Sequence, residues 1–349
     1  MTAEVRMRES FIHRESTLRV FRDLFLKGYG LSHAVVEPDR LVHWQAQTQD
    51  LREKAGLEPS PLGRIPTLVF GGYFYNFSSP APSSETIAAA IDEAKRLGAR
   101  QLLVPTVRDI DDSSDLTAAG FRPLPCFVES IARLGPDLDA DLRARVGADR
   151  FRQIKRMVRR VERQYEFLFL RAADMEQDSG LVAEIARLHG LNISQHDFGV
   201  NFFRSEALQH VLQSPLRDRL LVGMRCDRGD GAPRQAVITL LCEETGELFA
   251  LAQGIDHEHV AREMNLYITL YYRLYEYGAA HGAHVFHLGR GAQDEKRRLG
   301  ANRYVLLNHW MKSDEPGFAG EIERLALAMR KILVLKTAHY AVECRGPSA

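Results

Sequence analysis

The sequence is poor in cysteine, and the four cysteines are far apart. Cys126, Cys226, Cys242 and Cys344 form no C-x-x-C pair. This spacing offers no zinc signature and is typical of a protein that folds in a reducing compartment. We therefore expect no metal site.

Long apolar runs are also absent. No segment reaches the roughly 18 uninterrupted apolar residues of a membrane-spanning helix. The N-terminal stretch MTAEVRMRESFIHRES lacks the apolar core of a secretory signal. The expectation is a cytoplasmic protein with no membrane span.

The chain has no excess of charge of one sign. Lys and Arg number 46, as do Asp and Glu, which gives a formal net charge of zero. A generally basic nucleic-acid binder is excluded, so any contact with nucleic acid must come from a local patch.

What the sequence does contain is an alternation of helical and strand-like patterns. Amphipathic helices are expected near 84–97, 174–190, 203–213, 261–280 and 318–333. Strands are expected at 101–105, 126–133, 219–225, 234–242, 247–253 and around HVFHL and RYVLLNHW. The three strands between 219 and 253 are joined by short polar turns, which predicts antiparallel pairing.

A pattern of helix, glycine and strand occurs twice. AKRLGARQLLVP (94–105) matches GAAHGAHVFHLG (278–289), and TAAGFRPL (117–124) matches RRLGANRYVL (297–306). Two matching blocks in the same order suggest that one α/β unit was duplicated. We expect an N-terminal domain at 1–140, a basic connecting helix at 141–163 and a C-terminal domain at 164–349.

The second half is similar to the GNAT acyltransferase superfamily, in its Fem-like branch of tandem-GNAT transferases. The resemblance rests on the strands of 234–253, the helix of 261–280, LGRG and EKRRLGA. It covers about 150–300, with 64–135 as a weaker first copy. It implies an α/β (α+β) fold of two GNAT-like domains, each a mixed, mostly antiparallel sheet flanked by helices.

The resemblance also implies a reaction. Proteins of this branch form amide bonds from an activated acyl donor, either aminoacyl-tRNA or acyl-CoA, used as a co-substrate with no tightly bound cofactor. The expected acceptor is an amine on a small molecule or a cell-wall-type precursor. The first half would be a scaffold or would bind the acceptor.

One lysine occupies a position of interest in this family. Many GNAT enzymes carry a tyrosine four residues before a glycine, and the corresponding residue before Gly300 is Lys296. Before Gly120 in the first half it is Leu116, which has no proton to donate. The resemblance implies that Lys296 stabilises the oxyanion or the leaving group. The alternative is a solvated lysine in a charged, exposed turn.

Other candidates lie next to the strands of the second half. Gly289 and Gly291 allow close approach of the backbone to a ligand, and Arg290 can bind a phosphate or carboxylate. Asp256 and His257 are candidate general bases, as is His259. His257 and His259 form an H-x-H pair, but no third metal ligand is evident.

Two features bear on the donor. The stretch from Gly254 has no G-x-G, so the usual cradle for the CoA pyrophosphate is not evident. Basic residues also recur at helical spacing between 152 and 163, and we expect Arg156, Arg159 and Arg160 to contact phosphates. The alternative is a solvated helix whose arginine stems cover apolar surface.

These observations predict an N-acyltransferase that moves an aminoacyl or acyl group to an amine, with aminoacyl-tRNA slightly favoured over acyl-CoA. The alternative is a non-catalytic tandem GNAT-fold protein that binds a phosphorylated ligand. The two hypotheses differ in what replacing Lys296 would do: only an acyltransferase has an acyl-transfer activity that the replacement could abolish.

Overall fold

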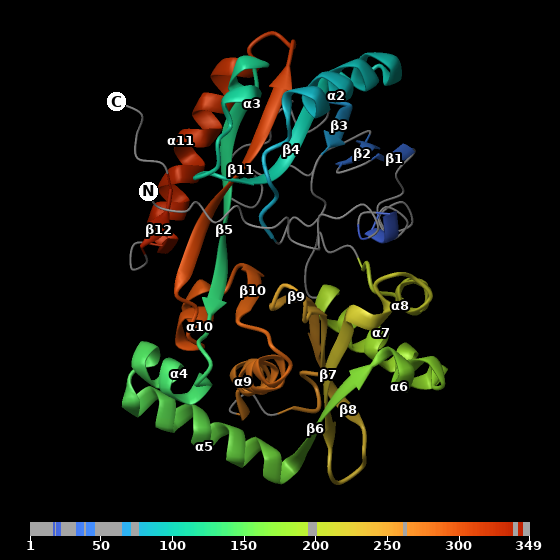
Figure 1. Cartoon of the computed structure of the whole chain (residues 1–349), viewed down its shortest axis with the longest axis vertical. Helices are drawn as coiled ribbons and strands as arrows, with labels where there is room; N and C mark the ends of the chain where they lie inside the picture. The colour runs from blue at the N-terminus through green and yellow to red at the C-terminus, as the bar shows by residue number, and fades with distance from the viewer. Residues whose placement is uncertain are drawn as a thin grey trace. The chain divides into compact units, whose positions relative to one another are not determined.

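The computed structural model describes residues 17, 19–21, 33–37, 40–45, 65–70, 77–194, 201–260, 264–337 and 341–344. The chain divides into two compact units (Figure 1). Unit 1 consists of Met1–Glu129 and Tyr304–Ala349, and unit 2 is Ser130–Arg303. No described helix is both long and apolar enough to cross a membrane.

The elements follow in chain order. Those assigned to unit 1 are β1 (His33–Glu37), β2 (Arg40–Gln45), β3 (Thr67–Phe70), α2 (Ser84–Leu97), β4 (Gln101–Arg108), α3 (Ser114–Ala118), most of β5 (Arg122–Arg133), nearly all of β11 (Arg303–Ser313), α11 (Phe318–Thr337) and β12 (Val342–Glu343).

Unit 2 contains the remaining elements. They are α4 (Leu138–Val146), α5 (Ala148–Gln164), β6 (Tyr165–Arg171), α6 (Ala172–Glu176), α7 (Ser179–Ile193), α8 (Ser205–Leu212), the 3-10 turn η4 (Arg217–Arg219), β7 (Leu220–Asp227), β8 (Pro233–Cys242), β9 (Glu247–Ile255), α9 (Leu266–Ala280), β10 (Val285–Arg290) and α10 (Gln293–Arg298).

Unit 1 contains a mixed sheet with the strand order β1-β2-β3-β4-β11-β5, and β12 pairs with β11. The pairs β1–β2, β2–β3 and β4–β11 are antiparallel, whereas β3–β4 is parallel. The alternation of side chains along each strand gives this sheet two apolar faces. Helices can therefore pack on both.

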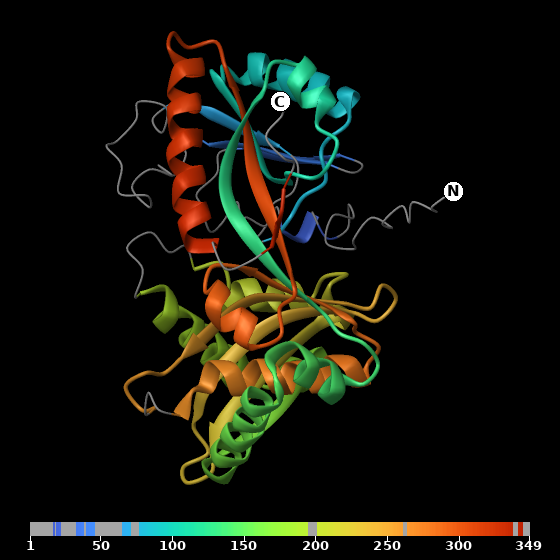
Figure 2. The same cartoon turned by 90° about the vertical axis from the view of Figure 1, so that its left-hand side faces the viewer.

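The two faces of this sheet carry different helices. Leu68, Val104 and Trp310 lie in one apolar cluster with α2 and α3. Val69 and Leu103 lie in another with the apolar side of α11 (Figure 2). Neighbours in sequence, such as Leu68 and Val69, thus point to opposite faces. This is the period of two that a strand imposes.

Local signals explain why α2 begins and ends where it does. Ser83 caps its N-terminus, since the Ser83 hydroxyl accepts a hydrogen bond from the Thr86 backbone N–H. Gly98 ends it in the left-handed conformation, with φ of 72°. Both the helix and its glycine stop are as the sequence predicts.

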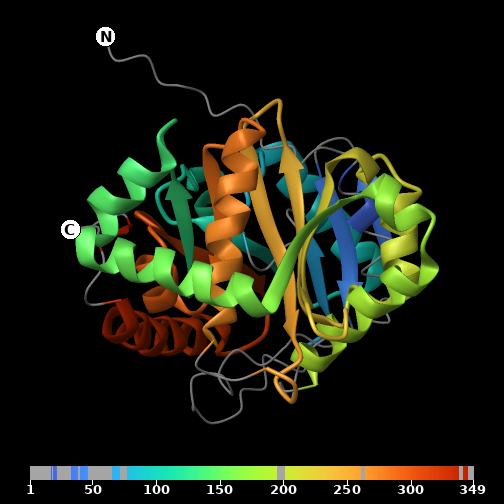
Figure 3. The same ribbon diagram turned by 90° about the horizontal axis from the view of Figure 1, so that it is seen from below.

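Unit 2 contains strands in the order β10-β9-β8-β7-β6 (Figure 3). The β6–β7, β7–β8 and β8–β9 pairs are antiparallel, which confirms the prediction for 219–253. The β9–β10 pair is parallel. The sheet is therefore mixed but mostly antiparallel, as the sequence predicts.

Helices cover both faces of these strands. On one face α9 contacts β7, because Leu270 lies beside Gly223. On the other face α7 approaches β9 very closely: a Cβ added to Gly254 would be 2.0 Å from the Leu188 carbonyl oxygen. Only glycine fits at this point of β9.

The compact units are not the linear halves expected from the repeated pattern. Tyr304–Ala349 is grouped with the N-terminal residues because β11 pairs with β4. The basic connection consists of two helices, α4 and α5, separated by Gly147. The two units are defined by contacts in space, whereas the two halves were inferred from the repeated sequence pattern. The duplication of one α/β unit therefore stays a prediction.

Candidate active site

The parallel strands β9 and β10 pair over only part of their length. Their register joins Val285 to Glu247, Phe286 to Leu248 and His287 to Phe249. Beyond Phe249, β9 continues to Ile255 and stays paired with β8. The side of β9 that faces β10 therefore has no partner strand after Phe249 among the described residues.

The hydrogen-bond alternation shows which peptide groups face this open side. The Asp256 N–H donates to the Arg234 carbonyl oxygen at 2.9 Å, so these residues form a hydrogen-bonded pair with β8. In an antiparallel ladder the bonded residues alternate. Gly254 is then bonded to β8, and the N–H and C=O of Gln253 point to the open side.

A β-bulge lies at the start of this open side. The β8–β9 register shifts between Ile238 and Thr239, which pair with Ala252 and Ala250. Leu251 is therefore an additional residue on β9. The open side thus offers main-chain donors and acceptors to an extended ligand that contains amide groups.

Lys296 lies in α10, shortly after β10, and it is buried. Lys296 is only 3% exposed, which contradicts the alternative of a solvated lysine. The Nζ donates to the carbonyl oxygens of Gly289 at 2.9 Å and Arg290 at 2.8 Å. The ammonium therefore holds the end of β10.

The connection from β10 to α10 requires unusual backbone angles. Gly289, Gly291 and Ala292 have φ of 70°, 74° and 48°. Left-handed residues this close together turn the chain sharply, and this places Lys296 back at the carbonyl groups of the strand it follows. The side chain of Arg290 is half-buried. The glycines predicted from sequence thus shape the turn.

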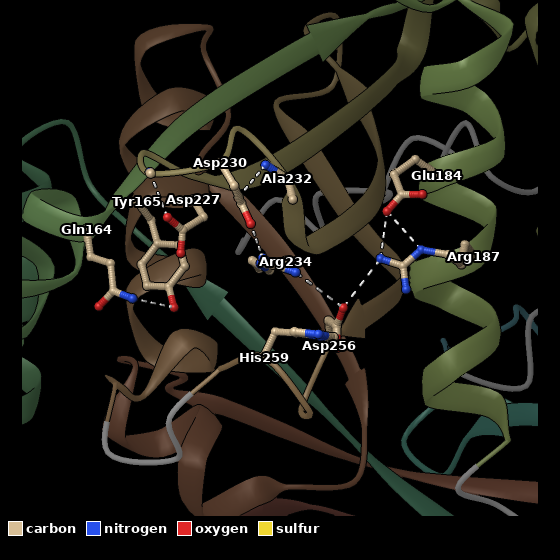
Figure 4. A network of polar contacts seen from close by, with 11 residues as sticks. Gln164, Tyr165, Glu184, Arg187, Asp227, Asp230, Ala232, Arg234, Asp256 and His259 are labelled. Atoms are coloured by element: carbon tan, nitrogen blue, oxygen red, sulfur yellow. Dashed lines mark hydrogen bonds and ion pairs between the residues drawn. The ribbon is translucent and has the colours of Figure 1, made fainter.

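Asp256 lies at the end of β9 in a network of cations (Figure 4). One carboxylate oxygen is 2.9 Å from His259 Nδ1, and the other is 3.5 Å from Arg187 and 3.8 Å from Arg234. Burial alone would raise the pKa of Asp256. The His259 hydrogen bond and the two guanidinium charges lower it overall, so Asp256 is a carboxylate.

The structure distinguishes the two histidines of the H-x-H pair. His259 contacts Asp256 through Nδ1, and the His259 side chain is 56% exposed. His257 is exposed and has no polar side-chain contact with the described residues. Of the two, only His259 is oriented by a carboxylate.

The basic helix α5 presents one cationic face. Its opposite face is apolar and buried through Ile154, Val158 and Val161. The exposed arginines of the first face are Arg152, Arg156, Arg159, Arg160 and Arg163, and we call them the arginine stripe. They span about 16 Å at 1.5 Å per residue.

Most of the arginine stripe lacks acidic partners. Arg152 pairs with Asp149, but the other four arginines make no ion pair or hydrogen bond with any described residue. Arginines elsewhere are commonly paired: Arg122 contacts Glu323, and Arg324 contacts Glu321. The stripe is therefore a local concentration of uncompensated positive charge in a chain with zero net charge.

A polar cluster fixes α5 against its neighbours. Lys155 Nζ is 2.6 Å from the Tyr272 hydroxyl of α9 and 3.1 Å from Asp139 of α4. The Tyr272 hydroxyl donates to the other Asp139 oxygen at 2.7 Å. Burial and the hydrogen bond to Asp139 raise the pKa of Tyr272. Lys155 thus attaches α5 to α4 and α9, whereas the arginine stripe lies on the exposed face of α5.

Sequence reasoning missed the cations around Asp256. His259 is three residues away and was a candidate, but Arg187 and Arg234 lie on α7 and β8, and no local pattern links them to Asp256. Among the described residues, no group of three His, Cys, Asp or Glu side chains is arranged to hold a metal.

Comparison with known families tests the resemblance. Residues 148–297 match the acetyltransferase (GNAT) domain. This segment of the chain is therefore a GNAT domain. The matched GNAT segment begins in α5, includes all of β6–β10 and ends within α10, after Lys296. It therefore contains the open side of β9 and all of α5, the helix that carries the arginine stripe.

Solved structures share the fold at low sequence identity. The C-terminal domain of an Agrobacterium fabrum protein assigned as a lysylphosphatidylglycerol synthetase is 11% identical, with a TM-score of 0.57 over 91% of this chain and 96% of that one. L-PGS from Bacillus licheniformis gives 11% and 0.57, over 91% and 98%. FemX gives 10% and 0.55, over 87% and 93%. No curated protein sequence matches this chain.

Proposed function

We propose that this GNAT protein forms an amide bond by transferring an aminoacyl group from tRNA to an amine. The open side of β9 beside the end of β10 is the observation that carries the proposal. Its unpaired main-chain groups can hold the acyl donor in an extended conformation. The acceptor would be an amine on a small molecule or a cell-wall-type precursor.

The reaction requires stabilisation of negative charge. The acceptor nitrogen attacks the acyl carbonyl carbon, a C–N bond forms, and the bond from that carbon to the ribose oxygen breaks. Negative charge develops first on the carbonyl oxygen and then on the leaving oxygen. A fixed cation near either is worth roughly 3–4 kcal/mol. Lys296 is the buried cation at the end of β10 and is our candidate for this role.

Charge favours tRNA over CoA as the donor. The residues after β9 include Asp256 and Glu258, whose carboxylates oppose binding of a pyrophosphate at the start of α9. Arg156, Arg159 and Arg160 of the arginine stripe make no ion pair with any acidic residue that the structure describes, which suits a chain of phosphates. In this proposal the stripe binds the tRNA backbone.

The test uses purified full-length protein with total charged tRNA or acetyl-CoA as donor and a mixture of amines as acceptors. We expect amide products with charged tRNA. The variant with Arg156, Arg159 and Arg160 changed to Gln should lose roughly 10-fold or more in tRNA affinity and show a shallower dependence on salt. Transfer from acetyl-CoA alone would refute the choice of donor.

A matched control separates the stripe from general charge. Arg96, Arg122 and Arg324 are exposed arginines that each pair with a glutamate. Changing these three to Gln removes the same formal charge. We expect tRNA affinity and its salt dependence to stay near the wild-type values. An equal loss in both triple variants would show that the stripe is not specific.

One observation favours a non-catalytic binding protein as the second candidate. The Lys296 ammonium already donates to two carbonyl oxygens, so its charge has a structural use. A binding protein would hold a phosphorylated ligand through the stripe and transfer nothing. Ligand binding without product from either donor, unchanged by Lys296→Ala, would support this candidate.

A further inference from the structure

A pocket opens between α4 and α5, and it has no part in the chemical step proposed above. Its volume is about 650 Å³, which is within the range of small-molecule sites. The lining consists of three alanines together with Asp137, Asp139, Arg143 and Phe151. All of these residues belong to unit 2, so one compact unit forms the whole pocket. We call it the α4–α5 pocket.

Small side chains leave the space for this pocket. Ala140 and Ala144 are one turn apart on α4, and Ala148 begins α5. Between the two helices the chain turns at Gly147, whose φ is 84°. Figure 1 shows the two helices side by side, and the ion pair of Lys155 with Asp139 joins them. Helices held together across short side chains leave room between them for a ligand.

Two charged groups of the pocket are available to a ligand. Asp137 caps α4 through Oδ1, which accepts a hydrogen bond from the Ala140 N–H at 2.9 Å. The other oxygen of Asp137 makes no hydrogen bond or ion pair with any residue that the structure describes, and neither does the exposed guanidinium of Arg143. Asp139, by contrast, is already paired with Lys155. The pocket therefore offers one carboxylate acceptor and one guanidinium donor.

Phe151 gives the pocket an aromatic surface. Its side chain is half-buried, and Lys155 Nζ lies 5.8 Å from the centroid of the ring. That ammonium is also held by Asp139 and by the Tyr272 hydroxyl. An aromatic ring that lines an open pocket is a surface on which another planar π-system can stack.

The α4–α5 pocket adjoins the arginine stripe. With 3.6 residues per turn, Arg152 is offset from Phe151 by about 100° around α5, and Arg159, roughly two turns further along, by about 80°. Both arginines are exposed. Positive charge thus begins next to the pocket and continues along the helix. A ligand that fills the pocket and also carries a chain of phosphates matches both features.

The chemistry of the lining distinguishes among ligands that carry phosphates. An inorganic polyphosphate has no group to stack on Phe151, and the Asp137 carboxylate repels it. An unpaired ribonucleotide has a planar base, a 2′-hydroxyl that can donate to a carboxylate and a phosphate that can accept from a guanidinium. DNA lacks the 2′-hydroxyl, and the bases of a duplex are covered by their stacked neighbours. The lining therefore fits single-stranded RNA best.

We infer that the α4–α5 pocket binds one unpaired nucleotide of an RNA, with the base stacked on Phe151, the 2′-hydroxyl donating to Asp137 and a phosphate bound by Arg143. The arginine stripe then binds the phosphates that follow along the strand. This inference rests on the proposed use of charged tRNA and deepens it, because the protein then recognises an unpaired RNA segment as well as phosphate charge.

The binding test uses the full-length protein and a short RNA strand that is abasic except for one 2-aminopurine, whose fluorescence falls when it stacks on an aromatic ring. We expect wild type to bind this strand about 10-fold more tightly than a wholly abasic strand of the same length, and to quench its fluorescence. Phe151→Leu should remove both effects. Phe127→Leu, at a half-buried phenylalanine of unit 1, is the control and should match wild type. Equal affinity of wild type for the two strands overturns the inference, because only phosphates would then be bound.

A second measurement concerns the sugar. The 2-aminopurine nucleotide is prepared with ribose or with 2′-deoxyribose, and wild type should prefer ribose by about 10-fold, the scale of a hydrogen bond to a charged group. Asp137→Ser should lose this preference while keeping a residue type that caps α4. Asp178→Ser makes the same change at the exposed N-cap of α7 and should keep the preference. Equal binding of both sugars by wild type contradicts the inference.

A variant at the surface guards against a folding defect. Arg143 is exposed and makes no ion pair with the described residues, so Arg143→Gln should leave the free energy of unfolding unchanged. We expect it to weaken binding of the RNA strand by about 3-fold and to make the dependence on salt shallower. Binding with the affinity and salt dependence of wild type would remove Arg143 from the site and contradict the inference.

Transfer from total charged tRNA separates this inference from the proposed function. If the pocket binds the donor, Phe151→Leu should raise KM for charged tRNA by about 10-fold with little change in kcat. The same KM in wild type and in Phe151→Leu leaves the proposed function standing and removes the nucleotide pocket. Base-dependent binding with no amide product from charged tRNA leaves the pocket standing and removes the proposed function.

Discussion

Two helix–glycine turns in this molecule have the same backbone. In unit 1, α3 is followed by Gly120, whose φ is 84°, and in unit 2, α10 is followed by Gly300, whose φ is 88°. The N–H after each glycine returns to the residue four before it: Phe121 to the Leu116 carbonyl and Ala301 to the Lys296 carbonyl, both at 2.9 Å. The turns differ in the side chain at that position.

The difference shows what each turn contributes. Leu116 is fully buried in an apolar cluster that includes Phe121 and Trp310. Lys296 is buried to a similar extent, yet its ammonium contacts main-chain carbonyl groups at the end of β10. Burial of a charge with neutral partners is costly. The turn in unit 2 thus contains a buried ammonium group, that of Lys296, where an apolar side chain such as Leu116 would be enough for packing.

The strongest test of this comparison is to put the lysine into the apolar turn. Leu116→Lys places an ammonium in a cluster of apolar side chains, without the strand-end carbonyl groups that surround Lys296. We expect the free energy of unfolding to fall by about 4 kcal/mol or more. Urea unfolding followed by circular dichroism measures it, with Leu116→Met as a control that should cost under about 1.5 kcal/mol.

The reverse change should mainly affect the reaction. We expect Lys296→Leu to lower the rate of acyl transfer by about 100- to 1,000-fold, because a fixed cation beside the developing negative charge is lost. The protein should remain folded, since an apolar side chain fits the buried position. Transfer from charged tRNA, with Arg298→Leu in the same helix as control, measures the effect. A rate like that of wild type would show Lys296 to be structural.

The local elements of the fold were predictable from the sequence. The helix of 84–97 and its stop at Gly98 follow from apolar spacing, a serine cap and a glycine, all within one stretch of chain. The antiparallel strands between 219 and 255 follow from short polar turns. These features depend on neighbours in sequence, and so the sequence carries their signal directly.

The features that depend on distant residues were not predictable. The pairing of β11 with β4 joins residues about two hundred positions apart in the sequence, and no local sequence pattern predicts this pairing. The same holds for Arg187 and Arg234 around Asp256. Counting back from Gly300 singled out Lys296 but gave no sign that it would be buried.

The glycines of the two turns should also differ in tolerance. Both have left-handed angles, which cost an alanine about 1–2 kcal/mol. A Cβ on Gly300 would in addition be 2.5 Å from Leu142, whereas one on Gly120 meets only the end of the Lys312 side chain at 3.5 Å. We expect Gly300→Ala to destabilise the protein by about 1–3 kcal/mol more than Gly120→Ala. Chemical unfolding of both variants measures the difference, and Gly300→Ala with Leu142→Ala should recover part of it.

The smallest expected effect concerns Asp256, the buried carboxylate at the end of β9. If the charged groups of unit 2 serve the reaction more than stability, Asp256→Asn should cost only about 1 kcal/mol at neutral pH, the scale of one hydrogen bond. The folded-state pKa of Asp256 is lowered, so its contribution is present above the ordinary aspartate pKa and is lost as pH falls through the lowered value. The difference between wild type and Asp256→Asn in urea unfolding should therefore shrink as the pH is lowered from 7 into the acid range. If the stability difference between wild type and Asp256→Asn instead grows on acidification, the Asp256 carboxylate is not held by His259 and the two arginines. That result would weaken the contrast between unit 2, whose charged groups serve the reaction, and the apolar turn of unit 1, which serves packing.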